Sequence, residues 1–231
     1  MNAGVAQVER LDFRFVPRRW AFADERRAKI DAHFAAAQRA NPRLWNGRVL
    51  MLHQQHIASG ILHGAFLETD YASFHAWLDW GRPAAGVWDC FGAAAVMGSD
   101  GAFLLGMMAP HTANGGRVYF PCGTPDLDDV RDGRVDFDHS VARELKEETG
   151  LVAAEFVAEP GWTLVYEAGR IVAYKVLLAP ETGEALASRV HEYLAQGRDD
   201  ELAGVRLASR LGDLDPAMPE YVVSFLKHRW R

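Results

Sequence analysis

The segment that most restricts how this 231-residue chain can fold is residues 143–151, Arg-Glu-Leu-Lys-Glu-Glu-Thr-Gly-Leu. Its carboxylates Glu144, Glu147 and Glu148 have the spacing i, i+3 and i+4, so a helix places them on one face. Beside them runs an apolar stripe that can pack on a core, formed by Val141, Ala142, Leu145 and Thr149. Gly150 is a helix-ending signal, which puts the acids in the last turns of the helix.

The end of a helix is an unfavourable place for three carboxylates. The helix dipole is negative there, so each acid costs about 0.3–1 kcal/mol in addition to the mutual repulsion. A bound divalent cation removes both costs, and oxygen ligands alone favour Mg²⁺ or Mn²⁺. The alternative is a solvated helix face on which Glu144 and Glu147 pair with Arg143 and Lys146.

The residues around these acids resemble a known signature. The run Arg-Glu-Leu-x-Glu-Glu-x-Gly-Leu, preceded by Phe120-Pro121-Cys122-Gly123, is similar to the Nudix box of the Nudix hydrolase superfamily. The resemblance implies a loop–helix–loop in which Glu144, Glu147 and Glu148 bind Mg²⁺ or Mn²⁺. In that family these metals cleave a diphosphate that is linked to another group.

The first half of the signature departs from the family pattern. Val135 and Asp129 stand where the family has a glutamate and a glycine, and Gly123 is the natural equivalent of that glycine. We therefore expect a lengthened, solvated loop over residues 126–137. Asp136 and Asp138 are candidates to replace the missing glutamate, and Asp138 is the expected cap of the helix.

The resemblance also assigns roles near the acids. Arg143 is expected to orient the glutamates by ion pairing, and Gly123 to let its loop approach the substrate. A further acid after the box serves as base or extra ligand in many members of the family. Glu201, at the end of the run Asp199-Asp200-Glu201, is the first candidate and Glu167 the second.

Charge and composition restrict the function classes. The net charge of −6 and the pI of about 5.8 argue against a nucleic-acid binder that works by bulk positive charge. No apolar run is long enough to span a membrane and no signal peptide is visible, so we expect a cytoplasmic protein with no membrane partner. Cys90 and Cys122 are too few for a disulfide framework or a cysteine zinc site.

Periodicity predicts an N-terminal α+β extension, residues 1–85, and a second domain, residues 86–231. The first is expected to hold a strand around Phe13 that ends at Pro17, a helix over residues 24–41 capped by Asp24, and a hairpin over residues 48–68. An aromatic helix is expected over residues 71–80, and either Thr69 or Asp70 can cap it. In the second, strands are expected at 91–97, 102–108, 118–120, 155–157, 162–167, 170–179 and 202–207, with helices around the box, at 184–194 and at the C-terminus. These patterns predict a mixed α/β domain, and the resemblance implies a Nudix-type α/β/α sandwich with a mixed sheet.

A fainter resemblance concerns the substrate. Residues 41–47 and 66–71 are similar to the N-terminal region of a Nudix branch that hydrolyses UDP-glucose and UDP-galactose. We therefore expect Mg²⁺-dependent hydrolysis of a nucleoside diphosphate linked to another group, such as a UDP-sugar. The alternatives are a nucleoside triphosphate pyrophosphatase and a non-catalytic Nudix domain used for binding or regulation. Many members of the family are dimers, so a homodimer is an expected assembly.

Overall fold

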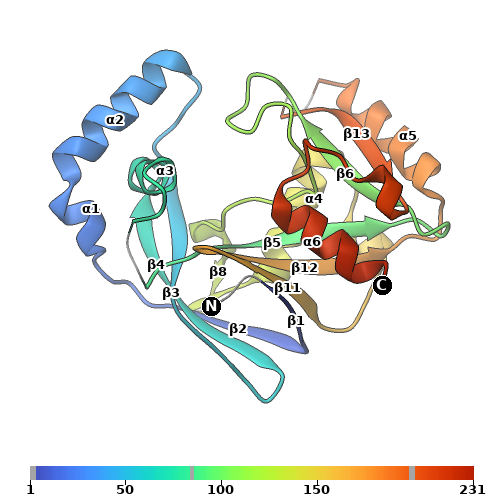
Figure 1. The fold of residues 1–231 in the computed structure, drawn as a ribbon, viewed down its shortest axis with the longest axis horizontal. Helices are drawn as coiled ribbons and strands as arrows, with labels where there is room; N and C mark the ends of the chain where they lie inside the picture. The colour runs from blue at the N-terminus through green and yellow to red at the C-terminus, as the bar shows by residue number, and fades with distance from the viewer. Residues whose placement is uncertain (1–3, 84–85, 198–200) are drawn as a thin grey trace. The chain divides into compact units, whose positions relative to one another are not determined.

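The computed structural model describes residues 4–83, 86–197 and 201–231, and it divides the chain into two compact units (Figure 1). Unit 1 contains the residues up to Glu9, Phe91–Gly123 and Asp138–Arg231. Unit 2 contains Arg10–Cys90 and Thr124–Phe137. The chain therefore passes from one unit to the other four times.

This division differs from the predicted boundary after residue 85 in two segments, and unit 2 also extends past that boundary to Cys90. The first strand belongs to unit 1 because it pairs with a strand far along the chain, with Gly4 opposite Tyr166. The segment Thr124–Phe137 belongs to unit 2, where its hairpin pairs with an N-terminal strand. Both pairings join residues more than a hundred positions apart, which local periodicity does not register.

Unit 1 is built on an eight-stranded sheet. Its strand order is β1-β11-β12-β5-β6-β13, with β10 beside β12 and β7 beside β6. The strands are β1 (Gly4–Val8), β5 (Asp89–Met97), β6 (Phe103–Met108), β7 (Val118–Tyr119), β10 (Val157–Ala158), β11 (Trp162–Glu167), β12 (Arg170–Leu178) and β13 (Leu202–Ala208). The predicted strand at 155–157 is wrong in its first part, since Ala153–Glu155 is a 3-10 turn.

Helices cover both faces of this sheet. They are α4 (Phe137–Thr149), α5 (Gly183–Leu194) and α6 (Glu220–Arg229). Tyr174 of β12 stacks on Phe225 of α6 with ring centroids 4.1 Å apart. Side chains alternate along a strand, so the next residue, Lys175, points to the opposite face, where its Nζ lies 4.0 Å from Asp138 of α4. The sheet thus lies between α6 and α4, which confirms the predicted α/β/α sandwich.

Unit 2 has a smaller, mixed sheet with helices packed on it. Its strand order is β3-β4-β2-β9-β8, in which β2 and β4 are parallel and the other pairs antiparallel. The strands are β2 (Arg10–Phe15), β3 (Arg48–Ala58), β4 (Ile61–Asp70), β8 (Val130–Arg131) and β9 (Arg134–Val135), and the helices are α1 (Ala21–Glu25), α2 (Arg27–Ala40) and α3 (Tyr71–Asp79). Its core contains Trp20, Ile30, Phe34, Met51, Leu67 and Trp77. The predicted hairpin over 48–68 and the aromatic helix are confirmed.

The two predicted helix caps in unit 2 have different outcomes. Asp70 accepts a hydrogen bond from the N–H of Ser73 at 2.7 Å and begins α3 as expected. Asp24 does not cap a helix, because it lies inside α1. There the helix begins beside Trp20, whose ring packs 4.7 Å from that of Phe22, so aromatic burial determines the start.

The expectation that residues 126–137 form a solvated loop is wrong. The segment holds a 3-10 turn, Leu127–Asp129, followed by the hairpin of β8 and β9. Asp129 is fully buried, and the side chains of Val135 and Phe137 are buried as well. The ring of Phe137 lies 4.8 Å from that of Phe13. The segment is therefore part of the core of unit 2.

The same region corrects the expected helix cap. Because α4 begins at Phe137, Asp138 lies within its first turn and is not the cap.

Asp132 and Gly133, between β8 and β9, have positive φ angles of 50° and 73°, which is the backbone of a tight hairpin turn. The dipeptide Asp-Gly is a strong hairpin signal, and the prediction of a loop over residues 126–137 did not use it. Among the described residues, no helix has both the length and the apolar character needed to cross a membrane.

Candidate functional site

The three glutamates at the end of α4 differ in exposure. The side chain of Glu147 is 60% exposed and that of Glu144 14%, while Glu148 is buried at 5%. The helical angle of about 100° per residue explains this order, because it turns Glu148 toward the buried Val141 and Leu145 and Glu147 away from them. The acids therefore form an arc from core to solvent across the one helix face on which their spacing places them.

Arg143 connects two of these acids. Its Nη1 lies 2.9 Å from Glu144 Oε1 and 3.1 Å from Glu147 Oε2. One guanidinium thus fixes the rotamers of a part-buried and an exposed carboxylate. The orienting role that the resemblance implies for Arg143 remains a prediction, and these two ion pairs are the contacts through which it would act.

The turn formed by residues 121–123 approaches the same acids. A Cβ atom added to Gly123 would lie 2.2 Å from Glu144 Oε1, which is closer than any real contact. The N–H of Cys122 donates to Glu148 Oε1 at 3.3 Å. The N–H of Ala94 donates to the carbonyl of Pro121 at 2.9 Å and ties this turn to β5. The sheet thereby holds a backbone segment without a Cβ directly against Glu144.

The last turn of α4 is closed by glycine and by a neighbouring helix. Gly150 has a φ of 72°, and its N–H donates to the carbonyl of Lys146 at 2.9 Å, so the predicted helix stop is confirmed. A Cβ on Gly150 would lie 2.4 Å from the ring of Tyr193, whose hydroxyl donates to the carbonyl of Glu147 at 2.9 Å. Tyr193 of α5 thus holds the acid-bearing turn, and nothing in the local sequence around the box indicates it.

Glu201 is exposed and directly precedes β13, and its carbonyl accepts from the N–H of Ala109 at 2.7 Å. Burial raises the pKa of Tyr119, and the negative charges of Cys122, Glu148 and Glu201 raise that pKa further. Glu148 and Glu201 thus influence one phenol from two elements of unit 1. The other members of the acidic run, Asp199 and Asp200, lie outside the described residues.

The other candidate acids have different surroundings. Glu167 lies 3.7 Å from Arg170 across the turn of its own hairpin. Asp138 is on the first turn of α4, six residues or about 9 Å along the axis before Glu144, and contacts Lys175. Asp136 belongs to unit 2, where its N–H donates to the carbonyl of Asp129 at 2.9 Å. None of these contacts places Glu167 or Asp138 beside the acids of the last turns.

The residues at the end of α4 fit a hard divalent cation. Their donor atoms are carboxylate oxygens, the ligand type that Mg²⁺ and Mn²⁺ prefer, and imidazole or thiolate ligands are not required. Because Gly123 has no Cβ, the Glu144 carboxylate lies directly against its backbone, in the position that a side chain would fill. Mg²⁺ bound by these carboxylates would complete its coordination shell with water and phosphate oxygens.

The two upstream segments that resemble the UDP-sugar branch contact each other in unit 2. The side-chain oxygen of Asn46 accepts from the N–H of Ala72 at 2.8 Å, and the carbonyl of Gly47 accepts from the N–H of Tyr71 at 2.9 Å. These bonds hold the junction between β4 and α3. These contacts give Asn46 and Gly47 a structural role at the junction, so a bound ligand is not needed to explain why these residues stand there.

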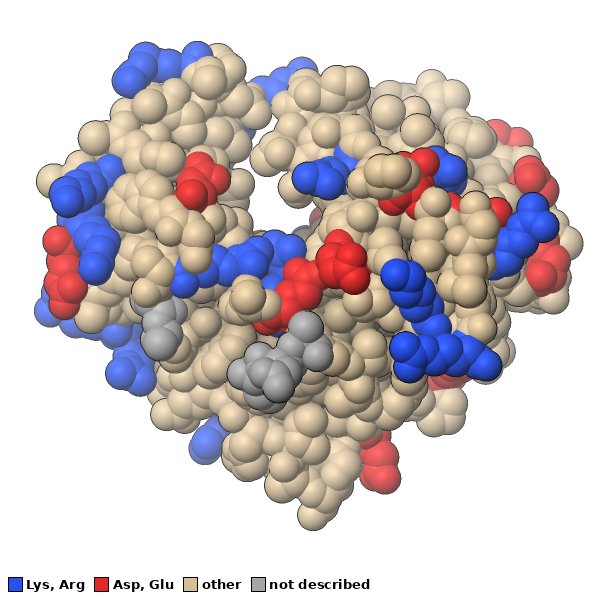
Figure 2. All heavy atoms as spheres, in the orientation of Figure 1, with Lys and Arg blue, Asp and Glu red and all other residues tan. Residues whose placement is uncertain are grey.

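A cavity of about 490 Å³ in unit 2 lies close to this junction and is lined by several arginines. Figure 2 shows Lys and Arg side chains at the left of the view, where α1 and α2 lie in Figure 1. Three of the lining arginines are paired with lining acids: Arg19 with Asp24 at 3.0 Å, Arg27 with Asp70 at 2.6 Å and Arg48 with Glu68 at 2.5 Å. The charges of this cavity are largely compensated, so it does not form a simple anion site.

Comparison with known proteins gives similarity to solved structures alone. No family model matches the sequence, and no curated protein matches it. The chain is similar to a Nudix hydrolase from M. smegmatis, RenU, at 16% identity and a TM-score of 0.35, over 61% of this chain and 81% of that one. It is similar to a MutT protein from Methanosarcina mazei Go1 at 19% identity and a TM-score of 0.37, over 61% and 91%.

A third similar structure is a bifunctional NMN adenylyltransferase/ADP ribose pyrophosphatase from Francisella tularensis. The identity is 14% and the TM-score 0.42, over 67% of this chain and 44% of that one. At such TM-scores and identities, none of these likenesses bears on what this chain binds or cleaves.

Proposed function

We propose that this chain is a Nudix-type hydrolase that cleaves phosphoric anhydrides with the help of Mg²⁺ or Mn²⁺. The observation that carries the proposal is the end of α4, where Arg143 pairs with Glu144 and Glu147 while the backbone of Cys122 and Gly123 approaches Glu148 and Glu144. The residue types match the second half of the Nudix box, and the contacts give them a common location in unit 1.

Within this proposal, Glu144, Glu147 and Glu148 would hold the metal. A metal bound there would polarise phosphoryl oxygens and lower the pKa of a bound water. Arg143 keeps two of the acids in fixed rotamers, so they need little reordering when a cation arrives. Gly123, which has no side chain, lets its backbone and the Glu144 carboxylate lie against each other where a diphosphate would approach. Glu201 is the proposed base that takes the proton from the attacking water.

The proposed substrate is a nucleoside diphosphate linked to a sugar or a similar group, with UDP-sugars as the first class to test. It would be cleaved between its two phosphates to a nucleoside monophosphate and a phosphorylated partner. Support comes from the resemblance of residues 41–47 and 66–71 to the UDP-sugar branch, and from the size of unit 2, which exceeds what diphosphate cleavage requires. The same proposal keeps the expected cytoplasmic location and homodimer.

The test is to compare kcat/KM for UDP-glucose, ADP-ribose, a dinucleotide and a nucleoside triphosphate at one Mg²⁺ concentration. We expect a sugar nucleotide to be preferred, because its sugar offers contacts that a triphosphate lacks. A preference for the triphosphate of tenfold or more, about 1.4 kcal/mol of transition-state stabilisation, would replace the sugar-nucleotide proposal with a triphosphate pyrophosphatase. If the protein hydrolyses none of these substrates, the alternative of a non-catalytic binding domain is favoured.

A further inference from the structure

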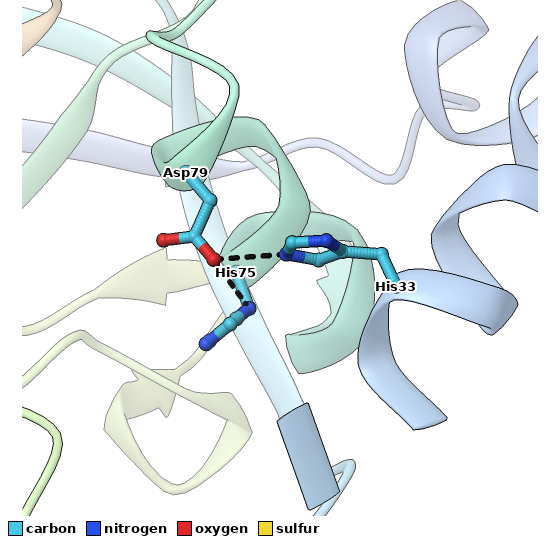
Figure 3. A group of neighbouring side chains, drawn as sticks. All are labelled: His33, His75 and Asp79. Atoms are coloured by element: carbon cyan, nitrogen blue, oxygen red, sulfur yellow. Dashed lines mark hydrogen bonds and ion pairs between the residues drawn. The ribbon is translucent and has the colours of Figure 1, made fainter. Parts of the chain in front are cut away.

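Two histidines and an aspartate converge on the helices of unit 2, far in sequence from the box. His33 comes from α2, and His75 and Asp79 come from α3 (Figure 3). His33 Nε2 lies 2.8 Å from Asp79 Oδ2, and His75 Nδ1 lies 3.4 Å from the same oxygen. One ligand atom from each residue can be chosen so that all three lie within 4.8 Å of one another.

These separations suit a tetrahedral metal site. Zinc binds imidazole nitrogen and carboxylate oxygen at about 2.0–2.2 Å, so two ligand atoms of one tetrahedron lie about 3.3–3.5 Å apart. The observed 2.8 and 3.4 Å are close to that spacing, and the ligand atoms of the two histidines, which lie within 4.8 Å of each other, would reach it by side-chain rotation. His75 and Asp79 are one helical turn apart and face the same way, while His33 approaches from the neighbouring helix.

Aromatic packing limits the freedom of both rings. The ring of His33 lies 5.5 Å from that of Trp80, in an edge contact. The ring of His75 lies 6.0 Å from Phe34 and 5.9 Å from Tyr71. His75 Nδ1 is buried and makes no hydrogen bond within the part of the chain that the structure describes. His75 Nδ1 is thus a buried nitrogen that faces the Asp79 carboxylate without a hydrogen bond, so it is available to bind a metal ion.

An ordinary histidine–aspartate pair in the same unit gives a useful contrast. His63 Nδ1 lies 3.0 Å from Asp12 Oδ2, and that aspartate also pairs with Arg134, a permanent cation. Within the described residues, Asp79 pairs with two imidazoles and with no lysine or arginine. The carboxylate of Asp79 therefore has no permanent positive charge in its ion pairs, and a bound cation would supply one.

We propose that His33, His75 and Asp79 bind one divalent transition-metal ion of the Zn²⁺ class and thereby join α2 to α3. Imidazole nitrogens select such metals, whereas the oxygen ligands at the end of α4 select Mg²⁺ or Mn²⁺. The side chain of Asp79 is 49% exposed, so water can reach the fourth coordination position. The chain would then hold two metal sites that differ in ligand chemistry and lie in different units. This second site does not depend on the function proposed for the first.

The test uses the full chain, stripped of metal with a chelator and titrated with Zn²⁺ by calorimetry in excess Mg²⁺. The Mg²⁺ occupies the oxygen ligands of α4 and leaves the imidazole site free. We expect one Zn²⁺ per chain, with affinity at least tenfold weaker in His33→Ala and in His75→Ala. Zn²⁺ should also raise the melting temperature of the wild-type protein and of neither variant, because it binds the folded state.

His63→Ala is the matched control, since it removes another imidazole that pairs with an aspartate in unit 2. It should bind Zn²⁺ as the wild type does. Asp79→Ala removes a ligand whose side chain is half exposed, so this variant is expected to fold and can replace a histidine variant that does not. Its Zn²⁺ affinity should fall in the same way. Unchanged Zn²⁺ affinity and stoichiometry in the folded variants would overturn the proposal, and so would an equal loss in His63→Ala.

Discussion

At the scale of single residues, the candidate site depends on contacts that differ for each of its three acids. Glu148 lies in the core beside the backbone of Cys122, Glu144 lies against Gly123, and Glu147 extends into solvent. A carboxylate in the core is costly unless it is paired or bound to a metal. The buried member of the set is therefore the one whose charge depends most on the site around it.

Gly123→Ala tests the close approach to Glu144. The new methyl group would overlap the carboxylate, so Glu144 must leave its position. We expect kcat/KM to fall by tenfold or more, about 1.4 kcal/mol, while the melting temperature stays within about 2 °C of the wild type. The control is Gly212→Ala, because the nearest atom to its new Cβ is 4.0 Å away. Equal activity of both variants would show that Glu144 is not needed where it lies.

At the scale of elements, the sequence predicted much of unit 1 and of the hairpin and aromatic helix in unit 2. Those elements have strong local signals, such as Asp70 before α3 and Gly150 after α4. The hairpin of β8 and β9 was missed because its strands have two residues each, too few for periodicity to register. The packing of Phe137 on Phe13 joins residues far apart in the chain, so no local sequence pattern predicts it.

Phe137→Ala tests whether residues 126–137 form core or solvated loop. The ring of Phe137 is buried against Phe13 and Phe66, so its removal should lower the free energy of unfolding by about 3–5 kcal/mol, measured by denaturant titration. Leu127→Ala in the same segment is the control, since Leu127 is 41% exposed and should lose about 0.5 kcal/mol or less. If both variants lose a similarly small amount of unfolding free energy, the interpretation of residues 126–137 as a solvated loop would be correct after all.

Asp70 makes a prediction that depends on pH. Burial alone would raise the pKa of Asp70, but hydrogen bonds from Ser73 and the guanidinium of Arg27 outweigh it and hold that pKa below its usual value. A lowered pKa means that the ionised form stabilises the fold above the unfolded pKa of about 3.9, and that this stability is lost as pH falls through the folded pKa.

We therefore expect Asp70→Ala to lower the free energy of unfolding by about 1–2 kcal/mol at neutral pH, through loss of the cap and the ion pair. The difference from the wild type should shrink as pH falls below about 4. Asp31→Ala, which removes an exposed partner of the same Arg27, is the control and should cost about 0.5 kcal/mol or less. A difference for Asp70→Ala that does not change with pH would contradict the assigned ion pair.

At the scale of the whole molecule, two units share one chain that crosses between them four times. The candidate acids and the turn that approaches them belong to unit 1, and the predicted zinc-class site belongs to unit 2. The resemblance to the Nudix box could be read from the sequence because the Arg-Glu-Leu-x-Glu-Glu-x-Gly-Leu run is continuous. Tyr119 and Tyr193 could not, since folding brings them to the acids from β7 and α5.

The measurement that tests the central claim most directly is Mg²⁺-dependent hydrolysis of a nucleoside diphosphate derivative by Glu148→Gln. Glutamine keeps the shape of the buried side chain and removes its charge, so the fold should remain while metal binding is lost. We expect kcat/KM to fall at least about 100-fold, about 2.7 kcal/mol, with an unchanged circular dichroism spectrum. Glu192→Gln, an exposed helical glutamate on α5, should match the wild type. Near-wild-type hydrolysis by Glu148→Gln at saturating Mg²⁺ would contradict the account.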